Sequence, residues 1–352
     1  MTWETSEQTN IGIDARFLDN RLSFTMDWYS KQTKDLLVEV GTNAASGFAT
    51  QYQNAGTVKN TGLELSMGWR DQIGKEFKYG VNVNMAYNKN EVTEVNNANH
   101  FIEGGNDLLA QSTGRFVRME EGHPIGYFYG YKTDGVIQNQ NDLQAYLDQN
   151  CKGNAANSKQ GASIKPGDLK FVDVDGNGVI NDDDKTDLGN PHPDVTMGLT
   201  LSAEYKGFDF SVLLQGVAKV KGMLSVYAGH AFYQEGNIQK WQMENCWNVQ
   251  QDNRYPEYPR LEIMSNAGSN NTLTSDFWVL DASFLKVRNV QLGYTLPEHI
   301  VKKFGSTGMR FYVSLDNPLT FKGYRKGWDP ENTSNNLSLI HISEPTRHLR
   351  IS

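Results

Sequence analysis

The feature that most constrains the fold of this chain is a strict alternation of apolar and polar residues over segments of about ten residues. Successive side chains of a β-strand point to opposite faces, so the alternation predicts strands with one apolar and one polar face. The segments group into four antiparallel hairpins, pairing 10–17 with 21–29, 63–70 with 77–87, 197–205 with 208–214, and 278–294 with 309–315. The first strand of the fourth hairpin changes phase between Val287 and Val290, which predicts a β-bulge.

The connections between these strands alternate in length. Short links at 18–21, 71–76, 206–207 and 295–307 alternate with long ones at 30–60, 88–194 and 217–276. Transmembrane β-barrels have short periplasmic turns and long extracellular loops, so we predict an all-β, antiparallel transmembrane β-barrel portion. Eight to ten such strands can form an open curved sheet as a portion of a larger barrel. A small closed barrel is the alternative.

Composition and charge exclude two other classes of protein. The mean hydropathy is -0.57, and no segment approaches the ~20 apolar residues that a membrane-spanning helix requires. The net charge of -8 argues against nucleic acid as a partner, because phosphate binding favours a basic surface. Aromatic residues near strand ends indicate an interfacial girdle, although core aromatics of a soluble sheet are the alternative; they are Trp28, Tyr29, Trp69, Tyr87, Phe208 and Tyr294.

One segment, residues 173–184, matches the calcium loop of an EF-hand position by position. Hard Ca²⁺ prefers six to eight oxygen ligands, and Gly at loop position 6 permits the sharp turn that this loop needs; that glycine is Gly178. The predicted ligands, at positions 1, 3, 5, 7, 9 and 12, are Asp173, Asp175, Asn177, the Val179 carbonyl, Asn181 and Asp184. Aspartate in place of the usual glutamate at position 12 would draw the following helix in or bind through one oxygen. We expect Ca²⁺ to order a long outer loop as a static clamp; an acidic solvated turn is the alternative.

No catalytic arrangement emerges from the sequence, which contains no H-E-x-x-H, G-x-S-x-G or Walker pattern. We therefore do not expect an enzyme; a calcium-dependent glycoside hydrolase would need two carboxylates across a cleft, and no such pair stands out. The loop 224–260 is rich in aromatic residues, which stack on sugars, grip peptides or pack against a partner protein. Its candidate ligand contacts are Tyr227, Tyr233, Trp241 and Trp247.

Several segments together resemble the C-terminal barrel region of SusC/RagA-type TonB-dependent outer-membrane transporters, over about 1–336. They are 121–135, 166–181 with 188–193, 281–297, and 316–320 with 328–331. The resemblance implies nutrient uptake of the Bacteroidetes type: import of glycans or peptides across the bacterial outer membrane, with a SusD-like surface lipoprotein as partner. It also implies energy from TonB–ExbB–ExbD through an N-terminal region that this chain lacks, so the chain alone would not transport.

The two ends of the chain depart from that family pattern. The first residues have no signal-peptide character, so either the protein is cytosolic or its true N-terminus lies upstream, and the resemblance favours the second. Residues 337–352 resemble translated sequencing adapter, and we expect them to be a non-native tail. The main alternative for the whole chain is a soluble calcium-stabilised β-sandwich that serves as a binding or adhesion module, which would lack lipid-facing aromatic bands.

Overall fold

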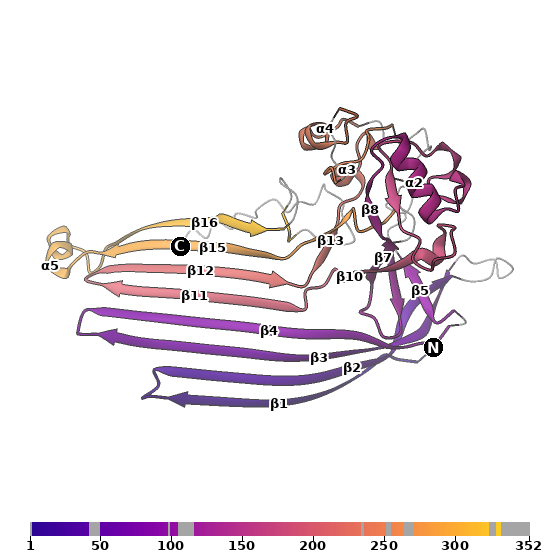
Figure 1. Cartoon of the computed structure of the whole chain (residues 1–352). Coiled ribbons are helices and arrows are strands. Elements are labelled where there is room, and N and C mark those ends of the chain that lie inside the picture. Colours follow the sequence, from indigo (N-terminus) through magenta and orange to yellow (C-terminus); the bar gives the residue numbers. More distant parts are fainter. Residues whose placement is uncertain are drawn as a thin grey trace.

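A long antiparallel sheet of eight strands dominates the computed structural model (Figure 1). The structure describes residues 2–41, 50–97, 99–104, 116–233, 236–250, 255–263, 271–323 and 329–331. The strands lie in the order β1-β2-β3-β4-β11-β12-β15-β16. Their bounds are β1 Thr5–Phe17, β2 Leu22–Gly41, β3 Thr50–Ile73, β4 Phe77–Val95, β11 Val195–Tyr205, β12 Phe208–Ala218, β15 Phe284–Thr295 and β16 Arg310–Lys322. In the described part of the chain β1 and β16 do not pair with each other, so the sheet is open, as predicted.

The first three predicted hairpins are confirmed, with apolar residues paired across the strands. The fourth is confirmed only from Phe284 onward, because Val279–Asp281 form a separate short strand that pairs with Lys221–Met223. Ile13 lies opposite Met26 in the first and Leu201 opposite Val212 in the third. The predicted bulge is also present, because the register of β15 shifts between Val287 and Asn289 against β16, and Arg288 is left out of both ladders.

Two of the predicted long connections are shorter in the structure than expected. We expected 30–60 to be a loop, but β2 runs to Gly41 and β3 starts at Thr50, with Val40 opposite Gln51. Likewise β4 continues to Val95 inside the predicted link 88–194. The strict alternation ends there because these strand ends pack locally: Val58, Val92 and Val95 are buried in a cluster with Met119. Within the described residues, no helix is long and apolar enough to cross a membrane.

The chain between β4 and β11 and between β12 and β15 forms a head at one end of the sheet (Figure 1). Its strands are β5 Phe101–Gly104, β6 Val117–Glu120, β7 Tyr127–Tyr131, β8 Thr133–Val136, β9 Leu169–Phe171, β10 Lys185–Gly189, β13 Lys221–Met223 and β14 Val279–Asp281. Its helices are α2 Gln140–Asn150, α3 Val226–Gly229 and α4 Lys240–Asn245, with 3-10 turns η2 Ala155–Asn157, η3 Gly161–Ser163 and η4 Asp182–Asp184. At the opposite end, α5 Glu298–Val301 and η7 Lys302–Phe304 connect β15 to β16.

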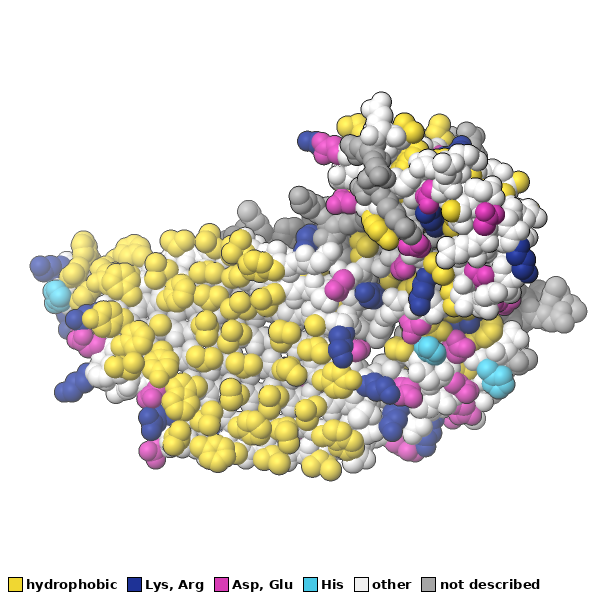
Figure 2. Space-filling view, in the orientation of Figure 1, with side chains coloured by type: hydrophobic (Ala, Val, Ile, Leu, Met, Phe, Trp, Pro, Cys, Tyr) yellow, Lys and Arg dark blue, Asp and Glu magenta, His cyan; other side chains and the backbone are white. Residues whose placement is uncertain are grey.

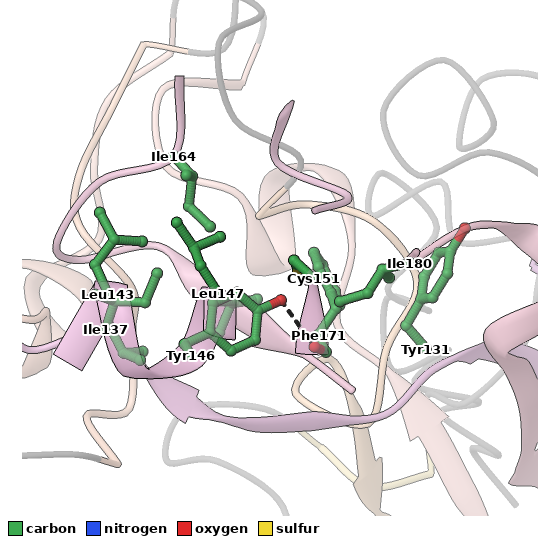
Figure 3. Packing of buried hydrophobic residues seen from close by; sticks show 11 residues of the cluster. Tyr131, Ile137, Leu143, Tyr146, Leu147, Cys151, Ile164, Phe171 and Ile180 are labelled. Atoms are coloured by element: carbon green, nitrogen blue, oxygen red, sulfur yellow. Dashed lines mark hydrogen bonds between the residues drawn. The ribbon is translucent and has the colours of Figure 1, made fainter. Parts of the chain in front are cut away.

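The buried core lies mainly in the head (Figure 3). Helix α2 begins at Asn139, whose side chain accepts hydrogen bonds from the backbone N–H groups of Asn141 and Asp142. The helix buries Leu143 and Leu147, which lie on one face because they are four residues apart. Tyr146 packs beside them and donates its hydroxyl to the Phe171 carbonyl at 2.8 Å, which fixes α2 against β9.

Candidate functional site

The eight-stranded sheet has two chemically different faces. One face is covered with hydrophobic side chains that remain open to the surroundings (Figure 2). Exposed members of this face include Ile13, Trp28, Leu63, Met67, Met85, Leu201, Phe210, Leu292 and Val313. In the described residues no second sheet packs on this face, which distinguishes the arrangement from a β-sandwich core.

The other face of the sheet is polar and hydrogen-bonded across strands. Thr25 donates to Asp14 at 2.7 Å, and the Tyr29 hydroxyl donates to the Asn88 amide oxygen at 3.0 Å. Asp27 and Glu64, directly opposite each other on β2 and β3, line an open depression of about 640 Å³. A face of this kind suits contact with water or a polar ligand, and the opposite face suits lipid.

The segment 173–184 adopts the turns that an EF-hand loop requires. Asp173 accepts backbone N–H groups from Gly176 at 2.9 Å and Gly178 at 2.7 Å, and Asn177 accepts from Val179 at 2.7 Å. Gly178 has φ +75°, a left-handed conformation that glycine adopts without strain. Short polar side chains therefore fold the backbone back around the loop centre.

Three of the predicted calcium ligands converge at that centre. Carboxylate oxygens of Asp173, Asp175 and Asp184 all lie within 4.8 Å of one another. Asp184 is fully buried and accepts backbone N–H groups from Val174 at 2.7 Å and Asn181 at 2.8 Å. At an effective dielectric constant of about 20, each pair of such carboxylates repels by roughly 3 kcal/mol. The all-oxygen donor set and the mutual repulsion of the carboxylates fit a hard divalent cation.

The other predicted ligands, Asn177, Val179 and Asn181, do not belong to the group of three converging carboxylates. The Asn177 amide donates to Asp175 at 2.7 Å, so its side chain lies at the edge of the carboxylate group. The Asn181 side chain caps η4 by accepting from the Asp183 N–H at 2.6 Å, which agrees with a water-mediated role at loop position 9. The turn η4 forms the last three residues of the loop, and strand β10 follows it in place of the helix that an EF-hand loop would lead into. Binding of the ion through one oxygen of Asp184 stays a prediction. The ligand role of the Val179 carbonyl stays a prediction.

The loop is fastened to the head by Asp182, a residue that motif matching did not identify. Its carboxylate accepts from the Tyr131 hydroxyl at 2.6 Å and pairs with Lys159 at 3.0 Å and Lys185 at 3.3 Å. The Tyr131 hydrogen bond and the nearby lysines hold the pKa of Asp182 well below its usual range. Ile180 enters the core beside Tyr131 (Figure 3). The conformation of the acidic loop 173–184 is thus tied to β7 and to the head core.

A second group missed from the sequence joins the segment that leads into the acidic loop 173–184 to the aromatic loop 224–260. Asp168 is buried and pairs with the Arg260 guanidinium at 2.5 Å, and it accepts from the Asn271 amide at 2.9 Å. The Asn271 oxygen in turn accepts from Leu169 N–H at 2.8 Å and from Gln160 at 2.9 Å. The Pro-Gly-Asp segment marked Asp168 as a residue of interest, but the sequence could not identify its partners because they lie far along the chain.

The aromatic residues proposed as ligand contacts mainly pack inside the head. Tyr233 is buried in a cluster with Phe116 and Phe128. Trp241 packs edge-on against Tyr258, with ring centroids 5.9 Å apart, and Trp247 donates to Gln138 at 3.3 Å. The Tyr227 side chain and residues 337–352 lie outside the described part of the chain. A ligand role for these aromatics stays a prediction.

Comparison with known proteins is consistent across sequence and structure. A family model described as TonB dependent receptor-like, beta-barrel matches residues 1–318. TonB-dependent receptor P3 of Formosa agariphila is 33% identical over 337 residues, 94% of this chain and 31% of that protein. TonB-dependent receptor SusC of Bacteroides thetaiotaomicron is 29% identical over 341 residues, 94% of this chain and 30% of that protein.

Among solved structures, the RagAB peptide importer in the 'closed-closed' state matches with a TM-score of 0.70. The two share 25% identity over 95% of this chain and 34% of that chain. The RagAB peptide transporter gives a TM-score of 0.68 at 24% identity, covering 95% of this chain and 34% of that chain, which supports the likeness of fold. This chain spans about a third of the length of the relatives it matches.

Proposed function

Because this chain belongs to the TonB-dependent receptor β-barrel family, we propose that it forms the C-terminal barrel portion of a bacterial outer-membrane importer. The observation that carries this proposal is the two-faced, single-layer sheet, with an exposed apolar face and a hydrogen-bonded polar face. In a membrane the apolar face contacts lipid and the polar face lines the lumen. The open edges at β1 and β16 then pair with further strands of the same barrel, because an uncovered sheet edge invites pairing.

The imported substrate class is an oligosaccharide or a peptide. The likeness to the RagAB peptide importer, 25% identical to this chain, supports a peptide, and the oligosaccharide comes from what the sequence resemblance implies. A SusD-like surface lipoprotein is the partner at the head, and TonB–ExbB–ExbD supplies energy through an N-terminal region outside this chain. The relatives are named as receptors and transporters, which agrees with an import function and no enzymatic one.

The acidic loop 173–184 binds Ca²⁺ in the same proposal. The three converging carboxylates, with Asn177 beside them, would hold the ion, and Ca²⁺ would supply the positive charge that offsets their repulsion. Since the loop is tied to the head through Asp182 and Ile180, the ion acts as a clamp on the head.

Two measurements on the full-length receptor test these proposals separately. A folded barrel should require detergent and should migrate faster on a gel before heating than after it. A receptor that is soluble without detergent and shows no heat-dependent mobility would instead support a soluble β-sandwich. Calorimetric titration with Ca²⁺ after chelation should show binding together with a rise in the melting temperature; no heat and no thermal shift would refute the calcium site.

Import itself can be tested in cells that carry the receptor gene or its deletion. Fluorescently labelled oligosaccharides and labelled peptides are supplied in parallel, and accumulation inside the outer membrane is measured. We expect one of the two classes to accumulate only with the intact receptor and with functional TonB. If both ligand classes accumulate in the deletion strain as much as in the strain with the intact receptor, import by this protein is contradicted.

A further inference from the structure

The short-turn end of the sheet carries a continuous row of large side chains across six strands. Directly paired positions place Ile73, Phe77, Tyr205, Phe208, Tyr294 and Phe311 side by side on β3, β4, β11, β12, β15 and β16. The rings of Phe208 and Tyr294 are 4.4 Å apart, and those of Phe77 and Tyr205 are 6.3 Å apart. Aromatic rows of this kind mark the boundary between hydrocarbon and headgroups in a membrane. The row therefore indicates where the apolar band ends.

Beyond that row the charge of the chain changes sign. The four connections at this end, 18–21, 74–76, 206–207 and 296–309, contain Arg21, Lys75, Lys206, Lys302 and Lys303 against Asp19, Glu76 and Glu298. Five cations thus face three carboxylates, whereas the whole chain has a net charge of -8. Figure 2 shows basic side chains gathered at this end, past the last hydrophobic ones.

The connection between β15 and β16 differs from the other three. It is the longest, and helices α5 and η7 extend it past the end of the sheet (Figure 1). The Val301 side chain of this connection is buried. In contrast, Phe304 is 71% exposed, and it directly follows Lys302 and Lys303 in the sequence. Lys302 pairs with Glu298 at 3.1 Å. Among the described residues, Lys303 has no anionic partner.

We propose that the β15–β16 connection is an interfacial anchor for anionic phospholipid in the membrane leaflet at the short-turn side. Phe304 enters the headgroup boundary region beyond the aromatic row, and Lys302 and Lys303 contact lipid phosphate groups beside it. An exposed phenylalanine beside two lysines suits this position, since the ring is apolar and the lysine stems reach toward the headgroups. This inference rests on the proposed membrane location, and it adds a lipid-binding role that import does not require.

The test uses the full-length receptor in detergent micelles, titrated with phosphatidylglycerol or phosphatidylcholine, with bound lipid counted by native mass spectrometry. For the double variant Lys302→Gln and Lys303→Gln we expect weaker phosphatidylglycerol binding, by about fivefold per lysine removed. Binding of phosphatidylcholine should change little in this variant. Phe304→Ser should weaken the binding of both lipids, because it removes the apolar contact and no charge.

The matched control is the double variant Lys165→Gln and Lys240→Gln, which removes the same charge from exposed positions on the head. It should bind phosphatidylglycerol as the wild type does. Equal binding by the Lys302/Lys303 variant and the wild type, or an equal loss in the control, would overturn the anchor. Heat-dependent gel mobility separates the two proposals: if the wild type lacks it, the membrane function fails and the anchor with it. If the wild type shows heat-dependent gel mobility but the Lys302/Lys303 variant binds phosphatidylglycerol as the wild type does, only the anchor proposal fails.

Discussion

At the scale of single residues, Gly178 is a position of the acidic loop 173–184 at which a side chain should be costly. Its φ is +75°, and a Cβ added there would lie 2.6 Å from both Cγ and Cε of Lys152. Gly178→Ala therefore combines backbone strain of about 1 kcal/mol with a steric clash. Gly176 is a matched control, because its φ is +74° but nothing lies within 4 Å of its added Cβ. Calorimetry should show a larger loss of Ca²⁺ affinity for Gly178→Ala than for Gly176→Ala; equal losses would show that Lys152 yields freely.

His230 predicts a pH dependence of the head. It is fully buried next to Trp278, and both ring nitrogens lack a hydrogen-bond partner among the described residues. Burial lowers the pKa of His230 to about 3. In the unfolded chain the His230 side chain has a pKa of about 6.5 and takes up a proton at a higher pH than in the folded protein. The free energy of unfolding therefore falls as pH drops below about 6.5.

The loss from His230 should reach about 2 kcal/mol between pH 7 and pH 5, and it should vanish in His230→Leu. Hydrogen exchange of the Leu224 amide, which donates to the Trp278 carbonyl at 2.9 Å, reports on this part of the head. Protection, corrected for intrinsic exchange rates, should fall with pH in the wild type and much less in the variant. The same pH dependence in both proteins would contradict the prediction.

Residue-level prediction from the sequence was good where a local motif sets the geometry. The spacing of Asp173, Asp175 and Asp184 predicted their convergence, because an EF-hand loop is defined by neighbours in the chain. It could not reveal that Asp168 meets Arg260 or that Asp182 meets Tyr131. Those contacts depend on how separate segments pack, which no local pattern encodes.

At the scale of elements, hairpins were predicted because alternation and turn residues act over a few positions. The bulge was visible in the sequence as a phase change around Arg288, but the contacts that the bulge gives to the Arg288 side chain were not. Excluded from both ladders, Arg288 donates to Gln215 at 2.6 Å and pairs with Glu331, which follows β16. The head was harder to predict, because its short strands and helices form around clusters drawn from distant segments.

The Asp168–Arg260 pair should control how the segment 255–263 packs on the rest of the head. Arg260→Met leaves the buried Asp168 carboxylate without its cation, a change that typically costs about 3–5 kcal/mol. The Arg260 amide donates to the Gly167 carbonyl at 2.9 Å, so its hydrogen exchange should accelerate strongly in a variant that loosens this contact; neighbouring amides of 255–263 should follow.

The control for this prediction is Glu262→Gln, which removes the second and more exposed partner of Arg260. Its effect should stay below about 1 kcal/mol, as for partly exposed ion pairs. If Arg260→Met and Glu262→Gln change the exchange of 255–263 equally, the buried pair is not what holds the two segments together.

At the scale of the whole molecule, the main sheet and the head are stabilised in different ways. The head buries its hydrophobic side chains in protein, whereas the sheet leaves an entire apolar face uncovered. A single layer with such a face is not stable in water, because the hydrophobic effect favours covering it. In the proposed barrel, lipid covers this face and neighbouring strands cover the two edges.

That difference predicts opposite outcomes for a lysine placed on either face in the apolar stretch of β3 near its short-turn end. Met67 lies on the apolar face opposite Val83, and Ser66 lies on the polar face opposite Asn84. A lysine at a lipid-facing position near the bilayer midplane costs about 2–4 kcal/mol, whereas a lumen-facing lysine stays hydrated. Met67→Lys should therefore lower the fraction of full-length receptor that folds into phosphatidylcholine vesicles, read as heat-dependent gel mobility, and Ser66→Lys should not. In a soluble protein with this sheet as its core, both substitutions would act without any dependence on lipid, and the membrane orientation of the sheet would be wrong.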